Sequence, residues 1–313
     1  MKTALIFPGQ GSQYVGMGKS LAENFSESRE IYERVDDALN ESFSKLIWEG
    51  PEDLLRKTEN TQPALMATSM AAIAAAKSLG FNFDQVSHVA GHSLGEYSAL
   101  CSVGGISLED SAKILRKRGK AMQEATPEGE GAMAAIIGIG IKEVDKVLSE
   151  ISMAGVCEIA NDNEPKQVVI SGTRDKVCLC MDLLKEAGAK RTILLPVSAP
   201  FHCSLMQSAA EIMKQEILDL TVNNLNIPIV ANISAKEISS EKDIKHSLVS
   251  QITSRVRWTE SITYLSKNNV VNFIEFGAGR VLSGLVKRIY PNSKTLNISE
   301  YQDLKKLEEN QGV

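Results

Sequence analysis

The sequence lacks the features that mark an exported or nucleic-acid-binding protein. Aromatic residues make up only 5% of its 313 residues, and no acidic or basic tail stands out against a formal net charge of −5. Because nucleic-acid-binding proteins need a basic surface, we expect no nucleic-acid partner. The N-terminal apolar run, residues 3–7, is too short for a signal peptide.

Long hydrophobic runs are also missing. The most apolar stretch of helical length, residues 64–76, is rich in alanine and is interrupted by Thr68 and Ser69. It is typical of a buried core helix and too short to cross a bilayer. We therefore expect no membrane partner.

Cysteine is scarce, and its spacing fits neither a disulfide framework nor a metal site. The five cysteines are odd in number, and the nearest pair, Cys178 and Cys180, is separated by one residue rather than two. With no export signal, we expect reduced thiols and a cytoplasmic protein.

What is present is an alternation of strand-like and helical patterns in both outer parts of the chain. Apolar runs at 3–7, 86–90, 228–232 and 274–276 each precede a turn or a helical pattern. This alternation predicts the α/β class, with a mostly parallel sheet covered by helices on both faces, as in a hydrolase-like large subdomain.

The middle of the chain has a different order of elements. After the linker-like residues 127–131, the patterns predict a strand (133–138), a helix (142–152), two strands (156–160 and 167–171), a helix (174–187) and a strand (191–197). This βαββαβ order is that of a ferredoxin-like unit. We therefore expect residues 127–197 to form a ferredoxin-like subdomain, inserted into a large α/β catalytic subdomain made of residues 1–126 and 198–313.

One short motif carries a chemical prediction. Gly91-His92-Ser93-Leu94-Gly95 is a G-x-S-x-G pattern between a predicted strand and a predicted helix. In a nucleophile elbow, small flanking residues expose the serine, and the helix N-terminus offers N–H groups to an oxyanion. The alternative is an ordinary glycine-rich turn with a serine cap. The context favours a nucleophilic Ser93.

A serine nucleophile needs a base, and the chain has only four histidines. His88 lies within a predicted strand, His92 should diverge from the serine hydroxyl, and His246 lies on a charged helix face. His202 follows a strand end, where α/β sheets place their chemistry. By elimination His202 is the predicted base, with a packed loop histidine as the alternative. No Asp or Glu between the serine and this histidine is an obvious third member of a triad.

Arg118 lies on the inner boundary of the predicted helix 108–125, between Ile114 and Met122 at one turn on either side. A guanidinium in that position needs an anionic partner. It forms either a structural ion pair with an internal Asp or Glu, or an anchor for a carboxylate on the substrate. The residues alone leave both interpretations open.

Taken together, the motifs resemble those of the malonyl-CoA:acyl carrier protein transacylases of bacterial fatty-acid synthesis. The matching segments are Phe7-Pro8-Gly9-Gln10-Gly11-Ser12-Gln13, Gly91-His92-Ser93-Leu94-Gly95-Glu96-Tyr97, Arg118-Gly119, Ala199-Pro200-Phe201-His202, Glu275-Phe276-Gly277 and Val281-Leu282. Their order and spacing match from end to end. The resemblance implies ping-pong transfer of a malonyl group from malonyl-CoA to the phosphopantetheine thiol of acyl carrier protein. It implies no metal or bound cofactor, and we expect a monomer.

The resemblance also implies roles for the matching residues. Ser93 would carry the acyl group, His202 would be its base, and the main-chain carbonyl of Gln251 would orient the histidine. Gln10 and the Leu94 N–H would form the oxyanion hole, with Gln10 also touching the substrate.

The acyl pocket follows from the same resemblance. Arg118 would bind the free carboxylate of the malonyl group, and Phe201 would line a malonyl-type pocket. Two other functions share part of this set. A serine esterase or thioesterase would use Ser93 and His202 but would give Arg118 no task, and a non-catalytic carrier-binding module would keep the fold without turnover.

Overall fold

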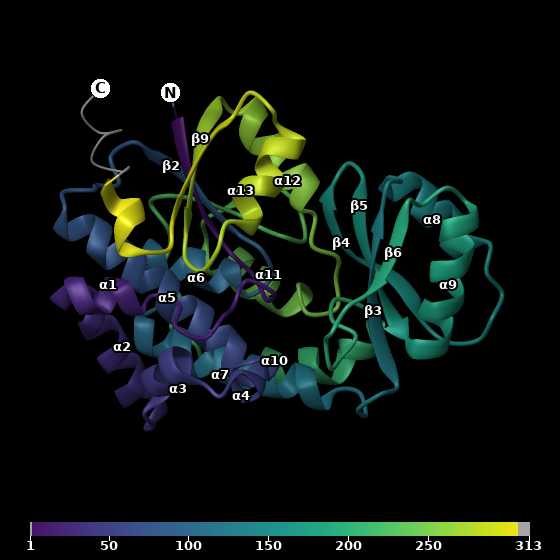
Figure 1. Ribbon diagram of the computed structural model, residues 1–313, viewed down its shortest axis with the longest axis horizontal. Coiled ribbons are helices and arrows are strands. Elements are labelled where there is room, and N and C mark those ends of the chain that lie inside the picture. The colour runs from purple at the N-terminus through teal and green to yellow at the C-terminus, as the bar shows by residue number, and fades with distance from the viewer. Residues whose placement is uncertain (1, 306–313) are drawn as a thin grey trace.

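The computed structural model describes residues 2–305 and contains two sheets (Figure 1). The N-terminal strand lies in the middle of the larger sheet. Met1 and the last eight residues, 306–313, of the predicted large subdomain lie outside the described part. The sheet has the order β10-β9-β1-β2-β7-β8. Its strands are β1 (Lys2–Phe7), β2 (Val86–Gly91), β7 (Ile229–Val230), β8 (Glu237–Ile238), β9 (Val270–Phe276) and β10 (Lys294–Ile298).

All neighbouring strands of this sheet run parallel except the short edge pair of β7 and β8. The side chains of β1 explain why both faces are covered. Leu5 and Phe7 belong to one hydrophobic core and Ala4 and Ile6 to another, and all four are fully buried. Strands buried on both faces are typical of parallel sheets. The predicted α/β class with a mostly parallel sheet is therefore confirmed.

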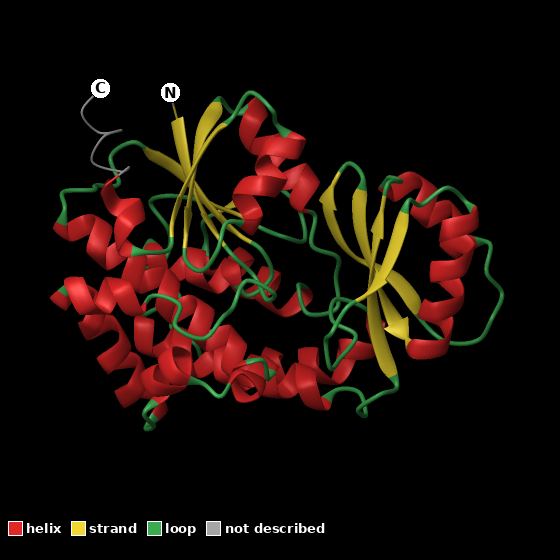
Figure 2. Cartoon of the chain, in the orientation of Figure 1, coloured by secondary structure: helices red, strands yellow, loops and turns green. Residues whose placement is uncertain are grey.

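Helices pack on both faces of this sheet (Figure 2). One core contains α5 (Thr58–Ser78) and α6 (Gly95–Ser102), and the other contains α12 (Trp258–Lys267) and α13 (Val281–Ile289). The remaining helices of this region are α1 (Lys19–Asn24), α2 (Ser26–Leu39), α3 (Phe43–Glu49), α4 (Glu52–Leu55), α7 (Leu108–Glu124), α10 (Gln207–Leu218) and α11 (Glu241–Ser250), with a 3-10 turn at Ser204–Met206.

The alanine-rich stretch 64–76 lies inside α5, where all but Ala74 are buried. The prediction of a core helix is therefore confirmed. Within residues 2–305, none of the helices combines the length and the apolarity that crossing a bilayer demands.

A second sheet is built from the middle of the chain. It contains β3 (Gly131–Ile137), α8 (Ile141–Ser149), β4 (Cys157–Glu164), β5 (Gln167–Thr173), α9 (Arg174–Glu186) and β6 (Arg191–Leu194), in that order. The strands are arranged β4-β5-β3-β6, and every neighbouring pair is antiparallel.

The two faces of β3 have different partners. Ala132, Ala134 and Ile136 belong to a core shared with α8 and α9, which cover the outer face of this sheet (Figure 1). Met133 and Ala135 belong to the main core of the larger region. The alternation along β3 therefore joins the second sheet to the rest of the protein.

Strand β4 differs from the prediction, because it continues four residues beyond its predicted end at 160. Val256 N donates to the carbonyl O of Ala160 at 2.8 Å, and Asp162 N donates to that of Val256 at 2.9 Å. Asp162, which falls between the predicted strands 156–160 and 167–171, is thus part of a strand. The C-terminal end of β4 is polar and shows no alternation of apolar residues, and its pairing partner Val256 lies far along the chain. The sequence pattern therefore does not predict this part of the strand. The patterns also do not predict α3, α4, β8 and β10.

A tight crossing of the chain makes Gly95 irreplaceable. A Cβ there would collide with the carbonyl O of Phe7 and lie 2.9 Å from that of Pro8. We expect Gly95→Ala to lower the free energy of unfolding by about 3 kcal/mol or more, because main chain must move. In Gly284→Ala, the control in α13, the nearest atom is a flexible Arg288 nitrogen at 3.5 Å. Urea unfolding should show that Gly284→Ala raises the free energy of unfolding by up to about 1 kcal/mol. Equal effects of the two changes would contradict this interpretation.

Candidate active site

The serine of the G-x-S-x-G motif lies at a sharp turn between β2 and α6. Ser93 has φ 54°, in the left-handed region that residues other than glycine rarely adopt. The glycine before it is required by space, because a Cβ on Gly91 would collide with the main chain of Gly95. The small flanking residues therefore allow a turn that a larger side chain would block, and Ser93 lines a pocket.

Asn232, which follows β7, holds this turn in place. Its Oδ1 accepts a hydrogen bond from Ser93 N at 2.8 Å, and its Nδ2 donates to the Gly91 carbonyl O at 2.7 Å. The Asn232 side chain is buried. Because the two bonds span the turn, they stabilise the unusual backbone conformation of Ser93.

His202 lies next to the serine hydroxyl. Its Nε2 is 2.8 Å from Ser93 Oγ, and its Nδ1 is 2.9 Å from the main-chain carbonyl O of Gln251. Because a carbonyl oxygen only accepts, Nδ1 carries the proton, and Nε2 can accept the hydroxyl proton. The orienting group is thus a main-chain carbonyl.

The imidazole is held in its neutral form. Burial lowers the pKa of His202 to about 3, and the positive charge of Arg118 makes the second-largest contribution to this shift. The carbonyl of Gln251 opposes this shift. At neutral pH the ring is therefore uncharged, as a general base must be.

The other three histidines point elsewhere. His92 Nε2 lies 2.8 Å from Asn163 Oδ1, His88 Nε2 lies 3.0 Å from a carboxylate oxygen of Glu237, and His246 is exposed on α11. Of the four histidines, all of which lie within residues 2–305, His202 is the one whose ring reaches the serine hydroxyl.

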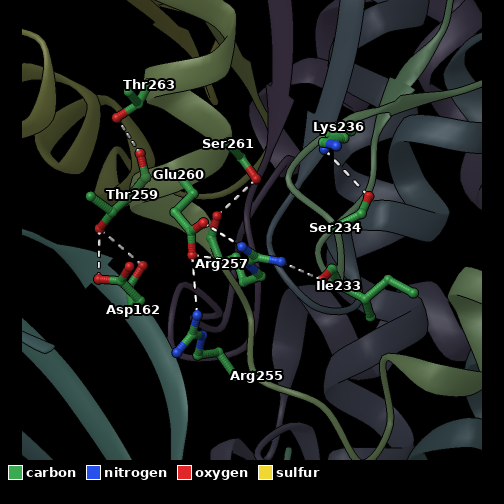
Figure 3. A network of polar contacts seen from close by, with 10 residues as sticks. All are labelled: Asp162, Ile233, Ser234, Lys236, Arg255, Arg257, Thr259, Glu260, Ser261 and Thr263. Carbon is green, nitrogen blue, oxygen red and sulfur yellow. Dashed lines mark hydrogen bonds and ion pairs between the residues drawn. The ribbon is translucent and has the colours of Figure 1, made fainter. Parts of the chain in front are cut away.

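The segment that carries Gln251 is tied to both sheets just beyond that residue. Thr259, in the first turn of α12, donates to Asp162 Oδ1 on β4 at 2.8 Å (Figure 3). Arg257 N donates to the carbonyl O of Asn232, which follows β7 of the larger sheet, at 3.1 Å, and Arg257 Nε donates to Glu260 Oε1 at 2.8 Å. These contacts fix the backbone after Gln251, and with it the carbonyl that faces the histidine.

Arg118 reaches the serine from α7 and is 1% exposed. Its Nη2 lies 3.2 Å from Ser93 Oγ and 2.8 Å from Gln251 Oε1, and its Nη1 lies 2.7 Å from Gln62 Oε1. All three partners are neutral, and Arg118 forms no ion pair within residues 2–305. The structural ion pair that the sequence left open as an alternative is therefore absent from this part of the chain.

A buried cation with neutral partners is costly unless a ligand supplies an anion. Burial lowers the pKa of Arg118, yet a guanidinium stays protonated in proteins. Its Nε has no hydrogen-bond partner within residues 2–305. The space beside Ser93 is thus suited to a negatively charged group.

Ser93 and Arg118 line a pocket of about 390 Å³, a volume suited to a small ligand. Its walls include Phe201, which the sequence predicted, and Met133 and Leu195 from the region of the second sheet. Because the exposed lining of this pocket is mainly apolar, electrostatic interactions inside it are stronger than in water. Across residues 2–305, no three His, Cys, Asp or Glu side chains are grouped to hold a metal ion.

The two donors predicted for an oxyanion also line this pocket. The Leu94 N–H has no hydrogen-bond partner in the described chain, 2–305, whereas the Ser93 N–H is taken by Asn232. Gln10 Nε2 makes only a long bond, 3.4 Å, to Thr58 Oγ1. Both groups are thus available to an oxyanion.

Sequence reasoning missed three buried polar residues of the site: Gln62, Glu96 and Asn232. Gln62 and Asn232 are neutral and stand in no motif. Glu96 gave a signal, because it stands in the matching segment 91–97 and is the one charged residue of the predicted helix that follows Ser93.

Comparisons with known proteins give the family. A model of the acyl transferase domain matches residues 4–311. The chain is 44% identical over 300 residues to the malonyl CoA-acyl carrier protein transacylase of Bacillus subtilis, covering 96% of this chain and 94% of that protein.

Solved structures that match this chain have names of the same kind. An acyl-carrier-protein S-malonyltransferase from Bartonella henselae superposes with a TM-score of 0.97, at 47% identity and 100% coverage of both chains. A second match belongs to a type II polyketide synthase acyl carrier protein in complex with its malonyl-transacylase. Its TM-score is 0.96 at 38% identity, over 99% of this chain and 100% of that chain. With a family model and relatives that match nearly from end to end, the chain belongs to the acyl transferase family.

Proposed function

We propose that this acyltransferase moves the malonyl group of malonyl-CoA to the phosphopantetheine thiol of acyl carrier protein, and so supplies extender units for fatty-acid synthesis. The reaction is ping-pong and passes through a malonyl ester on Ser93. The observation that carries the proposal is the Ser93–His202 pair with the buried guanidinium of Arg118 on the same serine oxygen. The names of the relatives, which include malonyl transfer and acyl carrier protein, support the substrates.

In the first half-reaction, Ser93 Oγ attacks the thioester carbonyl while His202 Nε2 takes the hydroxyl proton. The carbonyl oxygen becomes an oxyanion, which the Leu94 N–H and Gln10 Nε2 would bind. The carbon–sulfur bond then breaks, and His202 returns its proton to the departing thiolate. Coenzyme A leaves and the malonyl ester remains.

In the second half-reaction, the phosphopantetheine thiol of the carrier gives its proton to His202 and attacks the ester. The same donors bind the second oxyanion. The ester bond breaks, and His202 returns the proton to Ser93 Oγ. No metal or bound cofactor enters either step, because the carrier brings its own thiol.

Arg118 gives the acyl selectivity in this mechanism. The malonyl carboxylate would supply the anion that the buried guanidinium lacks. An acetyl group would leave the charge unpaired, which is a large penalty in a desolvated site. Phe201 would bound the space for the acyl group.

The two sheets support an assignment of the chain to two subdomains with different roles. We propose that residues 127–197 are a ferredoxin-like subdomain inserted into a catalytic subdomain of residues 1–126 and 198–313. The βαββαβ order and the strand order of the second sheet support this assignment. The insert would form one wall of the acyl pocket. A monomer suffices, since one chain provides all the proposed site residues.

Mixing the protein with malonyl-CoA should add one malonyl group to Ser93, because the pair with His202 activates that hydroxyl. Intact-mass spectrometry follows the group before and after addition of carrier protein that bears a free phosphopantetheine thiol. We expect the adduct to appear and then to move to the carrier, and Ser93→Ala to give no adduct. Release of free malonate in the presence of carrier would favour a hydrolase, and no adduct would reject malonyl-CoA as the donor.

Replacing Arg118 by alanine should abolish the preference for malonyl over acetyl and leave acetyl transfer in place. Breaking a buried charged contact costs about 3–5 kcal/mol, so kcat/KM for malonyl-CoA should fall by about 10²-fold or more. Arg116→Ala in the same helix removes a guanidinium that pairs with Glu41 and serves as the control. A malonyl preference unchanged in the Arg118 variant would refute the anchor.

Acylation of Ser93 should stay fast well below the ordinary histidine pKa of about 6.5. His202 has a pKa of about 3, so it remains a neutral base as the pH falls. Arg118→Ala should raise the pKa of His202 and move the acid limb to higher pH, because a positive charge is removed. Single-turnover rates between about pH 4.5 and 8 test this. A half-maximal rate near pH 6.5 in the unmodified protein would show that burial has no such effect.

A further inference from the structure

We propose that Glu96 is a positioning residue that acts through the side chain of Gln251 to hold Arg118 for the acyl carboxylate, and thereby sets the selectivity for malonyl over uncharged acyl groups. The inference rests on the function proposed above. It concerns a carboxylate to which the mechanism gives no task.

Glu96 lies in the first turn of α6, is 1% exposed, and forms no ion pair within residues 2–305. Its Oε2 accepts from Gln251 Nε2 at 2.6 Å and from the main-chain N of Asn232 at 3.2 Å, and its Oε1 lies 2.8 Å from Ser247 Oγ. Burying a carboxylate without a cation is costly. Two of its three partners are site residues, which suggests what the carboxylate does there.

The Gln251 amide carries the contact from Glu96 to Arg118. Its Nε2 donates to Glu96 Oε2 and to the Ser93 carbonyl O, 3.0 Å away, so both of its hydrogens are used. Its Oε1 must then face Arg118 Nη2, at 2.8 Å. If the amide were reversed, its oxygen would face two acceptors and its NH₂ group would face the guanidinium. Glu96 therefore favours the orientation in which Gln251 accepts from Arg118.

One intervening amide separates the carboxylate of Glu96 from the cation of Arg118. A direct ion pair would neutralise the guanidinium and compete with the carboxylate of the substrate. The amide of Gln251 instead fixes the guanidinium without pairing its charge. The charge stays available to the acyl group, while its position is set from the protein side.

The selectivity ratio separates this role from a general effect on catalysis. The main-chain carbonyl of Gln251 also orients His202, so a shift of Gln251 would slow acylation by every acyl-CoA. Only the contact with Arg118 distinguishes a charged acyl group from an uncharged one. The decisive quantity is therefore the ratio of acylation rate constants for malonyl-CoA and acetyl-CoA on the full chain.

Glu96→Ala should lower this ratio about tenfold or more, a loss typical of an outer partner that orients a binding group. Glu96→Gln should keep the ratio within about twofold, because its carbonyl oxygen can still accept from Gln251 Nε2 and its NH₂ group can face Ser247 Oγ. An unchanged ratio in Glu96→Ala would overturn the proposal. So would an equal loss in Glu96→Gln.

Glu275 provides the matched control, as a second buried glutamate outside the pocket. It accepts from the main-chain N–H groups of Leu282 at 3.0 Å and Ser283 at 2.7 Å. Glu275→Ala should lower the thermal stability but leave the malonyl-to-acetyl ratio unchanged. An equal fall of the ratio in this variant would mean that loosening of the fold is the cause, and would overturn the positioning role.

Binding of free malonate separates this proposal from the proposed function, because it requires no turnover. Calorimetric titration with malonate, and with acetate as the reference, should give tighter malonate binding to the unmodified protein and to Glu96→Gln than to Glu96→Ala. This result would support the positioning role even if malonyl-CoA failed to acylate Ser93, which would refute only the function. Equal malonate affinity in Glu96→Ala would overturn the positioning role and leave malonyl transfer intact.

Discussion

The buried positive charge of Arg118 is the constraint on which the rest of the site depends. The guanidinium is held by side-chain oxygens of Gln62 and Gln251, neither of which carries a charge. A cation in these surroundings is stabilised when a ligand brings an anion to it. The same charge contributes to the depressed pKa of His202. In the proposed mechanism, one group therefore would both favour a charged acyl group and help to keep the base neutral.

The fold brings four distant segments to this charge. Ser93 comes from the turn between β2 and α6, Arg118 from α7, His202 from the chain that follows the second sheet, and Gln251 from the end of α11. Gln251 contacts all three of the others, through its carbonyl to the histidine and through its side chain to the arginine and to the Ser93 carbonyl O. The proposed base and the proposed carboxylate receptor are thus both held by Gln251, and packed helices and strands set their geometry.

Elements with an apolar pattern could be predicted from the sequence, because β1, β2 and α5 are buried almost throughout and α7 buries one face. The polar end of β4 could not, because its pairing with residue 256 depends on contacts far along the chain. In the site, the motif and elimination predicted Ser93 and His202, two residues that the structure brings together. Gln62 and Asn232 are neutral residues that contact the site across 56 and 139 positions. No local pattern marks such residues, since their importance arises only when the chain has folded.

The central claim is that the charge of Arg118 has no anion in direct contact with it in the free enzyme and gains one in the malonyl-enzyme. Thermal unfolding of the free enzyme, the malonyl-enzyme and the acetyl-enzyme, each prepared without carrier protein, tests this most directly. The malonyl-enzyme should unfold at a higher temperature than the other two, by about 2 °C for each kcal/mol gained in a chain of this size. Equal unfolding temperatures for the malonyl- and acetyl-enzymes would contradict the account.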